Sequence, residues 1–352
     1  MDDHPFPLLP ITPAPPYSWA QTVSALAGFG AVPDRGRPVD GNGTPVDPSQ
    51  AGAGTGWELA LRIGDGEQRL VSVRLVPAEG EGPFAPDLEL LASGGDARAA
   101  GSSAGTPGES GEFTLGEAQD VWDQLDHFLA LSLDLAPLVE EARNDPPFRP
   151  VVAALYGYHP PRFRTAFQAA CWTVVRQRTP QKFAVKTMHR LTDLLGPRIP
   201  SPGGPPLSLF PQPGDLAHGA RPELLEATNN LRKVERLEGL AAEFATVAEA
   251  ELVNGDYDEV FKWLKGLPGL GPWSAEQVMW RGLGRVERTP WRDTGALRAV
   301  SDVYTPGLTL IKEAAREQAK HYRELQGVWL AYLKAYPRVG PPAKDLPRAP
   351  AG

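Results

Sequence analysis

Cysteine is almost absent from this sequence, because Cys171 is the one cysteine among 352 residues. A single cysteine excludes an intramolecular disulfide, a zinc site built from several cysteines and an iron–sulfur cluster held by four cysteines of one chain. The neighbours of Cys171 in AACWTVV are mostly apolar. We therefore expect a buried and unreactive thiol.

The sequence also lacks long hydrophobic runs. It contains no stretch of about 18 apolar residues, which excludes a membrane-spanning helix. The first residues, MDDHPFPLLPITPAPP, are acidic and rich in proline, and they lack the basic start and apolar stretch of a secretory signal. We expect a cytoplasmic protein with no membrane partner.

Positive charge is scarce overall and unevenly placed. The net charge is −8, but residues 1–150 carry 8 Lys+Arg and 23 Asp+Glu, whereas residues 151–352 carry 27 and 20. A cationic half of this kind is typical of proteins that bind polyanions. Residues 162–190 contain seven cations and no acid; a solvated helix surface would explain them equally well. The seven are Arg162, Arg164, Arg176, Arg178, Lys182, Lys186 and Arg190.

Composition and apolar spacing divide the chain into four regions. We expect a disordered N-terminus over residues 1–16 and an antiparallel β domain with long flexible loops over 17–112. An all-α core follows over 113–336, and the tail 337–352 is expected to be disordered. The fold class is therefore α+β, with a small N-terminal sheet ahead of the helices.

Within the β domain, residues 17–31 have the pattern of a short amphipathic helix. WELALRIGDGEQRLVSVRLV (57–76) alternates apolar and polar residues around GDGE, which predicts a β-hairpin. A third strand is expected at 88–93. We expect a long loop over 32–56 and a mobile segment over 94–112, which has few apolar residues.

The helical region opens with Thr114 and Glu117, whose spacing predicts a capping box. Pro- and Gly-rich joints separate the segments that follow. Helical apolar spacing occurs over 163–176, 181–195, 222–250, 256–265, 272–283, 293–304 and 309–336.

The stretch LPGLGPWSA (267–275) joins two of these helices. Gly266 is expected to end the first helix, and Pro272 suits the first position of the second. Gly269 and Gly271 place no side chain on the turn, so backbone N–H groups beside a helix N-terminus can approach a phosphate. Such a contact supplies affinity and register without base specificity. A plain helix–helix connection that binds nothing is the alternative.

Asp293 precedes the apolar stripe of the next helix, so it is expected to be its N-cap. The helix dipole favours an ionised carboxylate at that position. In a cationic region, such a carboxylate could stabilise a positively charged sugar or activate a water molecule. A purely structural cap is the alternative.

LPGLGPWSA followed by RDTGALR resembles the helix-hairpin-helix DNA glycosylases. Their signature is an LPG-φ-G hairpin with an essential aspartate about twenty residues further on, and 20 positions separate Trp273 from Asp293. Within this superfamily the chain looks most similar to the 3-methyladenine DNA glycosylase II branch. AFQAACWTVVRQRTPQKFA (166–184), LFPQPGDLA, NNLRKVERLEGLAAEFA and HYREL resemble further segments of that branch, and the similarity runs over residues 15–336. The resemblance implies a core of two helical subdomains.

The resemblance implies that Asp293 is the catalytic aspartate of a base-excision repair enzyme acting on alkylated bases in duplex DNA. Bifunctional relatives carry a nucleophilic lysine where this chain has Trp273, so no Schiff base is expected there. The implied enzyme is monofunctional, without lyase activity, and leaves an abasic site. Trp273 would form a wall of the pocket that receives the flipped base; core packing is its alternative role.

The DNA-binding residues implied by the resemblance lie in the hairpin and in a wedge loop. Arg178 matches the wedge that fills the space left by the flipped base, although well-known relatives have an aliphatic residue there; a surface cation is the alternative. The set comprises Gln177, Arg178, Thr179, Gly269, Gly271, Pro272 and Ser274.

The implied base pocket departs from that of well-studied relatives, which carry aromatics at the positions of Gln277, Thr294 and Ala319. We expect a wider or more polar pocket, lined also by Trp291 or Tyr322. No cofactor is required. The resemblance implies that a monovalent cation, Na⁺ or K⁺, could bind the main-chain carbonyls of Lys265, Leu267 and Leu270.

Three functions remain open from the sequence. A monofunctional glycosylase requires Asp293 to be essential for base release. A helix-hairpin-helix DNA-binding protein with altered or no glycosylase activity would bind DNA in a salt-dependent way and yield no abasic product. A helical protein unrelated to DNA would not bind it. We favour the glycosylase and expect a monomer; methylated adenine, other methylated purines and hypoxanthine all remain possible substrates.

Overall fold

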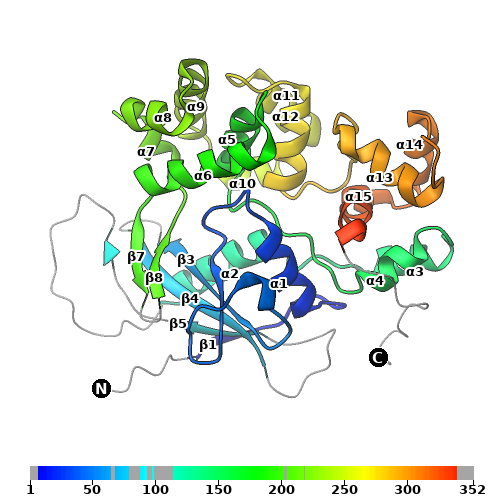
Figure 1. The fold of residues 1–352 in the computed structure, drawn as a ribbon, viewed down its shortest axis with the longest axis horizontal. Coiled ribbons are helices and arrows are strands. Elements are labelled where there is room, and N and C mark those ends of the chain that lie inside the picture. The colour runs from blue at the N-terminus through cyan, green and yellow to red at the C-terminus, as the bar shows by residue number, and fades with distance from the viewer. Residues whose placement is uncertain are drawn as a thin grey trace.

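The computed structural model describes residues 7–64, 68–78, 88–92, 97–98, 114–201, 204–217 and 219–338. It has an antiparallel sheet near the N-terminus and a larger helical part, which confirms the α+β fold class (Figure 1). The sheet lies beneath one group of helices, and a second group lies beside both (Figure 1). Within the described residues, no helix is both long and hydrophobic enough to cross a bilayer.

The N-terminal sheet is antiparallel throughout and has the order β1-β5-β4-β3-β2, with β6 paired to β4. The expected hairpin is formed by β3 and β4, in which Trp57 faces Leu75 and Leu61 faces Val71. Residues 65–67 of its expected turn lie outside the described residues. The strands are β1 (Pro7–Ile11), β2 (Arg37–Val39), β3 (Gly56–Ile63), β4 (Arg69–Pro77), β5 (Leu88–Ala92) and β6 (Ala97–Arg98).

Two parts of this region differ from the expectation. Residues 7–11, expected to be disordered, form an edge strand that pairs with β5. The expected loop 32–56 contains β2 and a 3₁₀ turn, Pro48–Gln50. Short pairings of this kind depend on a partner strand distant in sequence, so local composition does not indicate them. Most of the segment 94–112 and the tail from residue 339 lie outside the described residues.

The two faces of the sheet contact different elements. Trp57, Leu59, Leu61 and Ile63 share one face, as expected, and belong to the main hydrophobic core with α1 and α2. A second hairpin, β7 (Arg198–Ser201) with β8 (Gly204–Ser208), packs on the other face through Ile199 and Leu207. This hairpin comes from the helical part of the chain, so it joins that part to the sheet.

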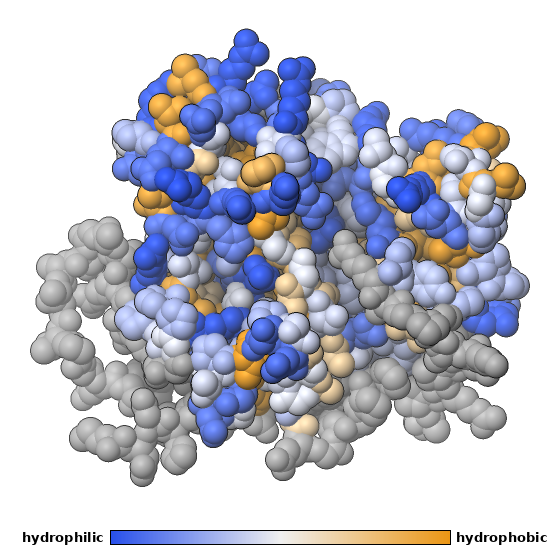
Figure 2. Space-filling view, viewed as in Figure 1, coloured by the Kyte–Doolittle hydropathy of each residue, from blue (hydrophilic) through white to orange (hydrophobic). Residues whose placement is uncertain are grey.

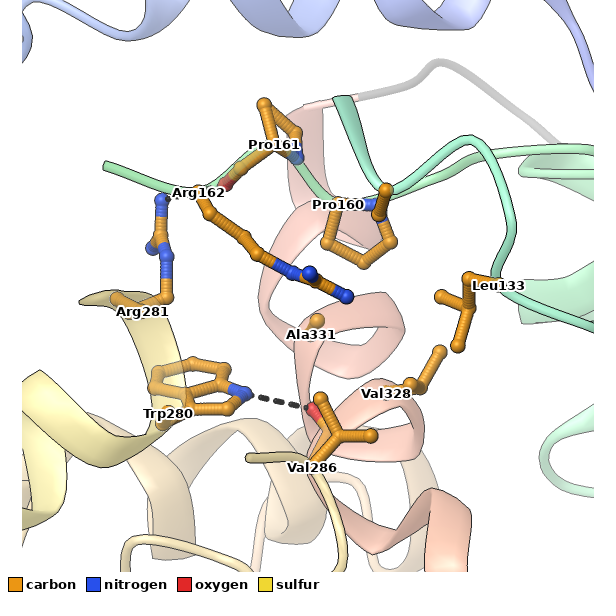
Figure 3. A pocket seen from close by; sticks show the side chains of 11 residues that line it. Leu133, Pro160, Pro161, Arg162, Trp280, Arg281, Val286, Val328 and Ala331 are labelled. Atoms are coloured by element: carbon orange, nitrogen blue, oxygen red, sulfur yellow. Dashed lines mark hydrogen bonds between the residues drawn. The ribbon is translucent and has the colours of Figure 1, made fainter. Parts of the chain in front are cut away.

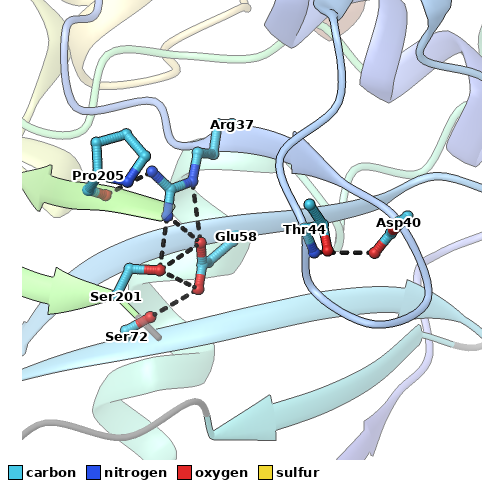
Figure 4. A network of polar contacts seen from close by, with 7 residues as sticks. All are labelled: Arg37, Asp40, Thr44, Glu58, Ser72, Ser201 and Pro205. Carbon is cyan, nitrogen blue, oxygen red and sulfur yellow. Dashed lines mark hydrogen bonds and ion pairs between the residues drawn. The ribbon is translucent and has the colours of Figure 1, made fainter. Parts of the chain in front are cut away.

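A buried ion pair fixes this second hairpin. Glu58 of β3 is fully buried and accepts hydrogen bonds from Arg37 Nε at 3.1 Å and Nη2 at 2.8 Å (Figure 4). Ser201 Oγ of β7 donates to the same carboxylate at 3.1 Å, and Arg37 Nη1 donates to the carbonyl of Pro205. Hydrogen bonds from several donors offset the desolvation of a buried carboxylate.

The helices largely follow the predicted segments, and Thr114 and Glu117 form the predicted capping box. Asn229 ends α8 in the left-handed conformation, and Asn230 caps α9, so the expected segment 222–250 is broken there. The helices are α1 (Trp19–Gly28), α2 (Leu115–Leu129), α3 (Ala136–Arg143), α4 (Arg149–Ala154), α5 (Ala166–Arg176), α6 (Gln181–Leu195), α7 (Pro213–Ala217), α8 (Arg221–Thr228), α9 (Leu231–Phe244), α10 (Glu249–Asn254), α11 (Tyr257–Gly266), α12 (Pro272–Gln277), α13 (Thr294–Tyr304), α14 (Lys312–Lys320) and α15 (Gln326–Ala335).

The helices pack around two separate hydrophobic cores. Helices α5, α6 and α8–α12 share the main core with the sheet, whereas α3, α4 and α13–α15 surround a second core. A π-helical turn, Val278–Gly282, continues α12. Its Trp280 packs into the second core, so this turn connects the two helical subdomains.

Candidate active site

The hairpin between α11 and α12 forms as the sequence predicts. Gly266 is the last residue of α11 and Pro272 the first of α12. Gly269 has φ of +80°, in the left-handed region that favours glycine. The N–H of Leu270 donates to the carbonyl of Leu267 at 3.0 Å, which closes the turn.

The outer side of the hairpin is open. Pro272 is exposed, and a Cβ atom on Gly271 would have no described heavy atom within 4 Å. The backbone here is therefore accessible to a ligand as large as a phosphate. Ser274 is only 3% exposed, because helix α12 turns its side chain toward the core; its role in DNA binding stays a prediction.

The loop between α5 and α6 projects Arg178 into solvent. Arg178 is exposed and has φ of +52°, a conformation that costs a non-glycine residue about 1–2 kcal/mol. Strained residues of this kind cluster at functional sites. The left-handed backbone conformation of Arg178 therefore supports a functional role for this loop.

The same loop is bonded to the hairpin. Gln177 Nε2 donates to the carbonyl of Gly269 at 2.7 Å, and Arg236 of α9 donates to Gln177 Oε1. Lys233, one turn earlier in α9, donates to the Val175 carbonyl at 2.7 Å and to Thr179 Oγ1 at 2.6 Å. The loop and the hairpin therefore form one rigid surface.

The cation-rich stretch 162–190 is only partly a surface. The guanidinium of Arg164 donates to the carbonyls of Asp34 and Ala60, and burial lowers the pKa values of Arg162 and Arg164. In contrast, Arg178, Lys182 and Lys186 are exposed. The surface over α6, α8 and α9 is mostly hydrophilic, with a few hydrophobic spots (Figure 2).

Asp293 caps α13, as predicted. Its Oδ1 accepts from the N–H of Gly295 at 2.9 Å, and its side chain is 16% exposed. Its Oδ2 forms an ion pair with Lys334 of α15, whose ammonium lies 5.4 Å from the ring centroid of Trp280. Both carboxylate oxygens are therefore held, and Asp293 remains partly accessible to solvent.

Glu276 connects the hairpin to the loop that carries Asp293. Its Oε2 accepts from the backbone N–H of Arg292 at 2.9 Å, and its Oε1 pairs with the Arg292 guanidinium. Because Arg292 directly precedes Asp293, α12 fixes the approach of the chain to the carboxylate.

The predicted pocket residues have different surroundings. Trp273 and Trp291 are half-buried, and Thr294 is exposed. Gln277 Nε2 is buried and donates to no acceptor among the described residues. A buried donor without a partner is costly and calls for an explanation, and ligand binding would provide one.

Tyr322 and Ala319 lie in the second core. Tyr322 is 4% exposed, stacks on Trp329 with ring centroids 5.5 Å apart, and donates to Asp145 at 2.7 Å. Ala319 is fully buried. Core packing accounts for the position of Tyr322, and its part in the base pocket stays a prediction.

A small cavity lies behind Trp280, where Trp280 Nε1 donates to the carbonyl of Gly327 at 3.0 Å (Figure 3). The Arg162 side chain reaches into it (Figure 3). Its volume is about 20 Å³, close to the space needed for one water molecule. A nucleobase would not fit, so this cavity is not the base pocket.

The proposed cation site is built from main-chain oxygens. The carbonyl of Leu267 already accepts the N–H of Leu270, and a carbonyl oxygen has a second lone pair for a cation. Among the described residues, no group of three or more His, Cys, Asp or Glu side chains could hold a metal ion. The monovalent cation at Lys265, Leu267 and Leu270 stays a prediction.

No family model matches the chain. Its structure is similar to that of 3-methyladenine DNA glycosylase from Archaeoglobus fulgidus, with a TM-score of 0.69, 21% identity, and coverage of 94% of this chain and 98% of that one. It is also similar to the Clostridium acetobutylicum 8-oxoguanine glycosylase/lyase in complex with double-stranded DNA, with a TM-score of 0.53, 15% identity, and coverage of 79% and 87%. The chain therefore has the fold of the helix-hairpin-helix DNA glycosylases.

Sequence similarity points to one branch among the DNA glycosylases that share this fold. DNA-3-methyladenine glycosylase of Bacillus subtilis is 23% identical over 217 residues, which are 61% of this chain and 71% of the relative. The resemblance to the 3-methyladenine DNA glycosylase branch is therefore confirmed.

The sequence interpretation missed the residues that connect these features: Lys233, Arg236, Glu276 and Lys334. Lys233 and Arg236 lie three residues apart and so share a face of α9. This spacing could have indicated from the sequence that the two side chains act on the same part of the structure. Nothing local marks Glu276 or Lys334, because their partners lie 16 and 41 residues away.

Proposed function

We propose that this protein is a DNA glycosylase of base-excision repair, which removes alkylated, 3-methyladenine-like bases from duplex DNA and leaves an abasic site. The observation that carries the proposal is Asp293, a partly exposed carboxylate fixed at a helix N-terminus and connected to the hairpin through Glu276. The sequence and fold similarities to DNA glycosylases support the same reaction.

DNA would bind across the hairpin and the Gln177–Thr179 loop. The open backbone at Gly271, at the start of α12, suits a phosphate, because N–H groups at a helix N-terminus and the helix dipole both favour an anion. Pro272 has no N–H to donate, but its exposed ring leaves the approach to the first turn open. Arg178 at the tip of the loop would enter the duplex where the flipped base was stacked. The hydrogen bond from Gln177 to Gly269 supports these two roles, since it holds the Arg178 loop at a fixed position relative to the phosphate-binding hairpin.

Asp293 would act on the sugar of the flipped nucleotide. A carboxylate held by Gly295 and Lys334 changes its orientation little during the reaction, so it can stabilise the positive charge that develops on the sugar as the base departs. Water that Asp293 positions would then complete hydrolysis. Alkylated purines are cationic and leave without protonation, so the reaction needs no separate general acid.

The pocket would use Trp273 as an aromatic wall, and Trp291 and Thr294 lie near Asp293 in sequence. The buried amide donor of Gln277 would supply a hydrogen bond to an acceptor on the base. We infer that the enzyme is monofunctional and has no lyase activity, since the hairpin carries Trp273 in place of a nucleophilic amine.

The test is base release from duplexes that each contain one defined lesion, followed by alkaline cleavage of abasic sites. The Asp293→Asn variant should lose base release and still bind the same duplexes. Full activity of that variant would contradict the proposal. Salt-dependent binding by the wild type without any abasic product would instead favour the helix-hairpin-helix DNA-binding protein.

A further inference from the structure

Of the phenylalanine, tyrosine and tryptophan side chains that the structure describes, Phe183 alone is exposed. It lies in the first turn of α6, is 50% exposed, and belongs to neither hydrophobic core. The surface around α6 is mostly hydrophilic (Figure 2). Single exposed apolar residues are common on protein surfaces, so the surroundings of this ring decide whether it has a partner.

The ring lies among cations that have no acidic partner. Lys182 Nζ is 5.1 Å from the centroid of the Phe183 ring, and Lys186 lies one turn further along the same side of α6. Both lysines are exposed and form no ion pair with a described residue, whereas Arg190, one more turn along, pairs with Glu226. An aromatic ring among unpaired cations suits a nucleic acid with an unpaired base, because the cations neutralise phosphates while the ring stacks on the base.

The ring is also close to the loop that carries Arg178. The chain from Arg178 to Phe183 spans at most about 18 Å, or about five base-pair steps of duplex DNA, and its last residues are helical and therefore more compact. Lys233 Nζ donates to Thr179 Oγ1 at 2.6 Å just before α6 begins. The tip of the loop and the ring therefore keep a fixed spacing.

We propose that Phe183 stacks on the base that loses its partner when the lesion is flipped, and that Lys182 and Lys186 bind phosphates of the same, opposite strand. The location of the DNA rests on the function proposed above. Where Arg178 fills the space left by the flipped base, the base opposite has no pairing partner and can leave the stack. Phe183 offers that base a new stacking surface, and every base has a face that can stack on an aromatic ring.

The experiment removes the ring and the opposite base, separately and together. Two duplexes of the same sequence carry a tetrahydrofuran abasic analogue at the position of the lesion. The position opposite holds adenine in one duplex and a second tetrahydrofuran in the other. Fluorescence anisotropy measures the affinity of the full-length protein for each duplex at one salt concentration, and we expect the wild type to prefer the duplex with adenine.

Four variants assign this preference. In Phe183→Ala it should fall about tenfold, which corresponds to about 1.4 kcal/mol and lies within the range for a base on an aromatic side chain; Phe183→Trp should keep it. Leu308→Ala, the matched control, should also keep it, because Leu308 is 73% exposed but lies between α13 and α14. Lys186→Met should weaken binding to both duplexes alike and reduce the salt slope by about 1. Thermal unfolding shows whether each variant is folded.

Two outcomes would overturn the proposal: equal binding of the two duplexes by the wild type, or an undiminished preference for adenine in folded Phe183→Ala. Neither duplex contains a damaged base, so base release is measured separately on the lesion-containing duplexes. Base release combined with an undiminished preference in Phe183→Ala would refute the stacking contact alone. A preference that depends on Phe183, without any base release, would refute the glycosylase and leave the contact standing.

Discussion

Glu276 offers a direct test of whether the hairpin and the carboxylate work as a unit. Its side chain is 11% exposed and accepts two hydrogen bonds from Arg292, one from the backbone N–H and one from the guanidinium. Replacing Glu276 by Gln leaves one carbonyl oxygen as acceptor, and replacing it by Ala leaves none. Both changes free the chain immediately before Asp293.

The size of the effect follows from the two bonds. A hydrogen bond that involves a charged group contributes about 1.5–3 kcal/mol, whereas an ion pair with an exposed partner such as Arg292 contributes about 0–1 kcal/mol. We expect the interactions that hold Arg292 in place to weaken by about 1.5 kcal/mol in Glu276→Gln and by about 3 kcal/mol in Glu276→Ala. If the loss falls on the placement of Asp293, base release slows by about tenfold and about 150-fold, respectively, at roughly 1.4 kcal/mol per factor of ten.

The assay is single-turnover base release from a lesion duplex, with DNA affinity measured by fluorescence anisotropy. The rate should fall while affinity for DNA changes little, because the phosphate contacts of the hairpin remain. Glu317→Gln is the matched control, since Glu317 also pairs with a cation, Lys320, but lies exposed on α14. A Glu276→Ala rate within twofold of the control, in a protein that Asp293→Asn inactivates, would refute the reasoning.

Three further predictions concern stability. Burial raises the pKa of Glu249 to about 7, so the folded state binds the extra proton, and stability should fall as pH rises from about 4.5 to 7. Glu249→Gln should therefore be more stable than the wild type at pH 8, by up to about 3 kcal/mol at roughly 1.4 kcal/mol per pKa unit, with no difference at pH 4 in urea titrations. Gly269→Ala should lower the free energy of unfolding by at least about 1–2 kcal/mol, because φ is +80° and the new Cβ would lie 2.5 Å from Arg236 Cδ; an unchanged urea midpoint would contradict this. Glu58→Ala removes the buried carboxylate that accepts from Arg37, which keeps its bonds to Pro205 and Ser201, and should cost about 1.5–3 kcal/mol, measured as a fall in thermal midpoint without loss of DNA binding.

Local signals made much of the site predictable. Proline at the start of α12, glycine at the end of α11 and Asp293 at the start of α13 each act within one turn of the helix they bound. Such rules depend on residues at most a few positions apart, so a sequence displays them directly. The resemblance to known glycosylases was recognised through the same short segments.

Contacts across the fold were not predictable in this way. Periodicity shows that a segment is a helix and which face is apolar, but not which other segment that face meets. Gln177 and Gly269 are 92 residues apart, and Lys334 and Asp293 are 41 apart. Arg164 shows the same limit, because its charge suggested a surface and its long side chain instead donates to buried carbonyls.

The residues of the site are divided between the two hydrophobic cores, and Glu276 connects the two parts. The hairpin and the Gln177 loop belong to the subdomain of the main core, whereas Asp293 and Lys334 both belong to helices of the second core. Movement between the subdomains would therefore leave the carboxylate–amine pair intact but change its distance from bound DNA. Contacts that oppose such movement include Glu276 with Arg292, Arg288 with Asp258 of α11, and Trp280 with the carbonyl of Gly327. Because Trp280 is also part of the second core, weakening the contact of Glu276 alone should loosen the placement of Asp293 without unfolding either subdomain. The expected signature is slower base release with an unchanged free energy of unfolding.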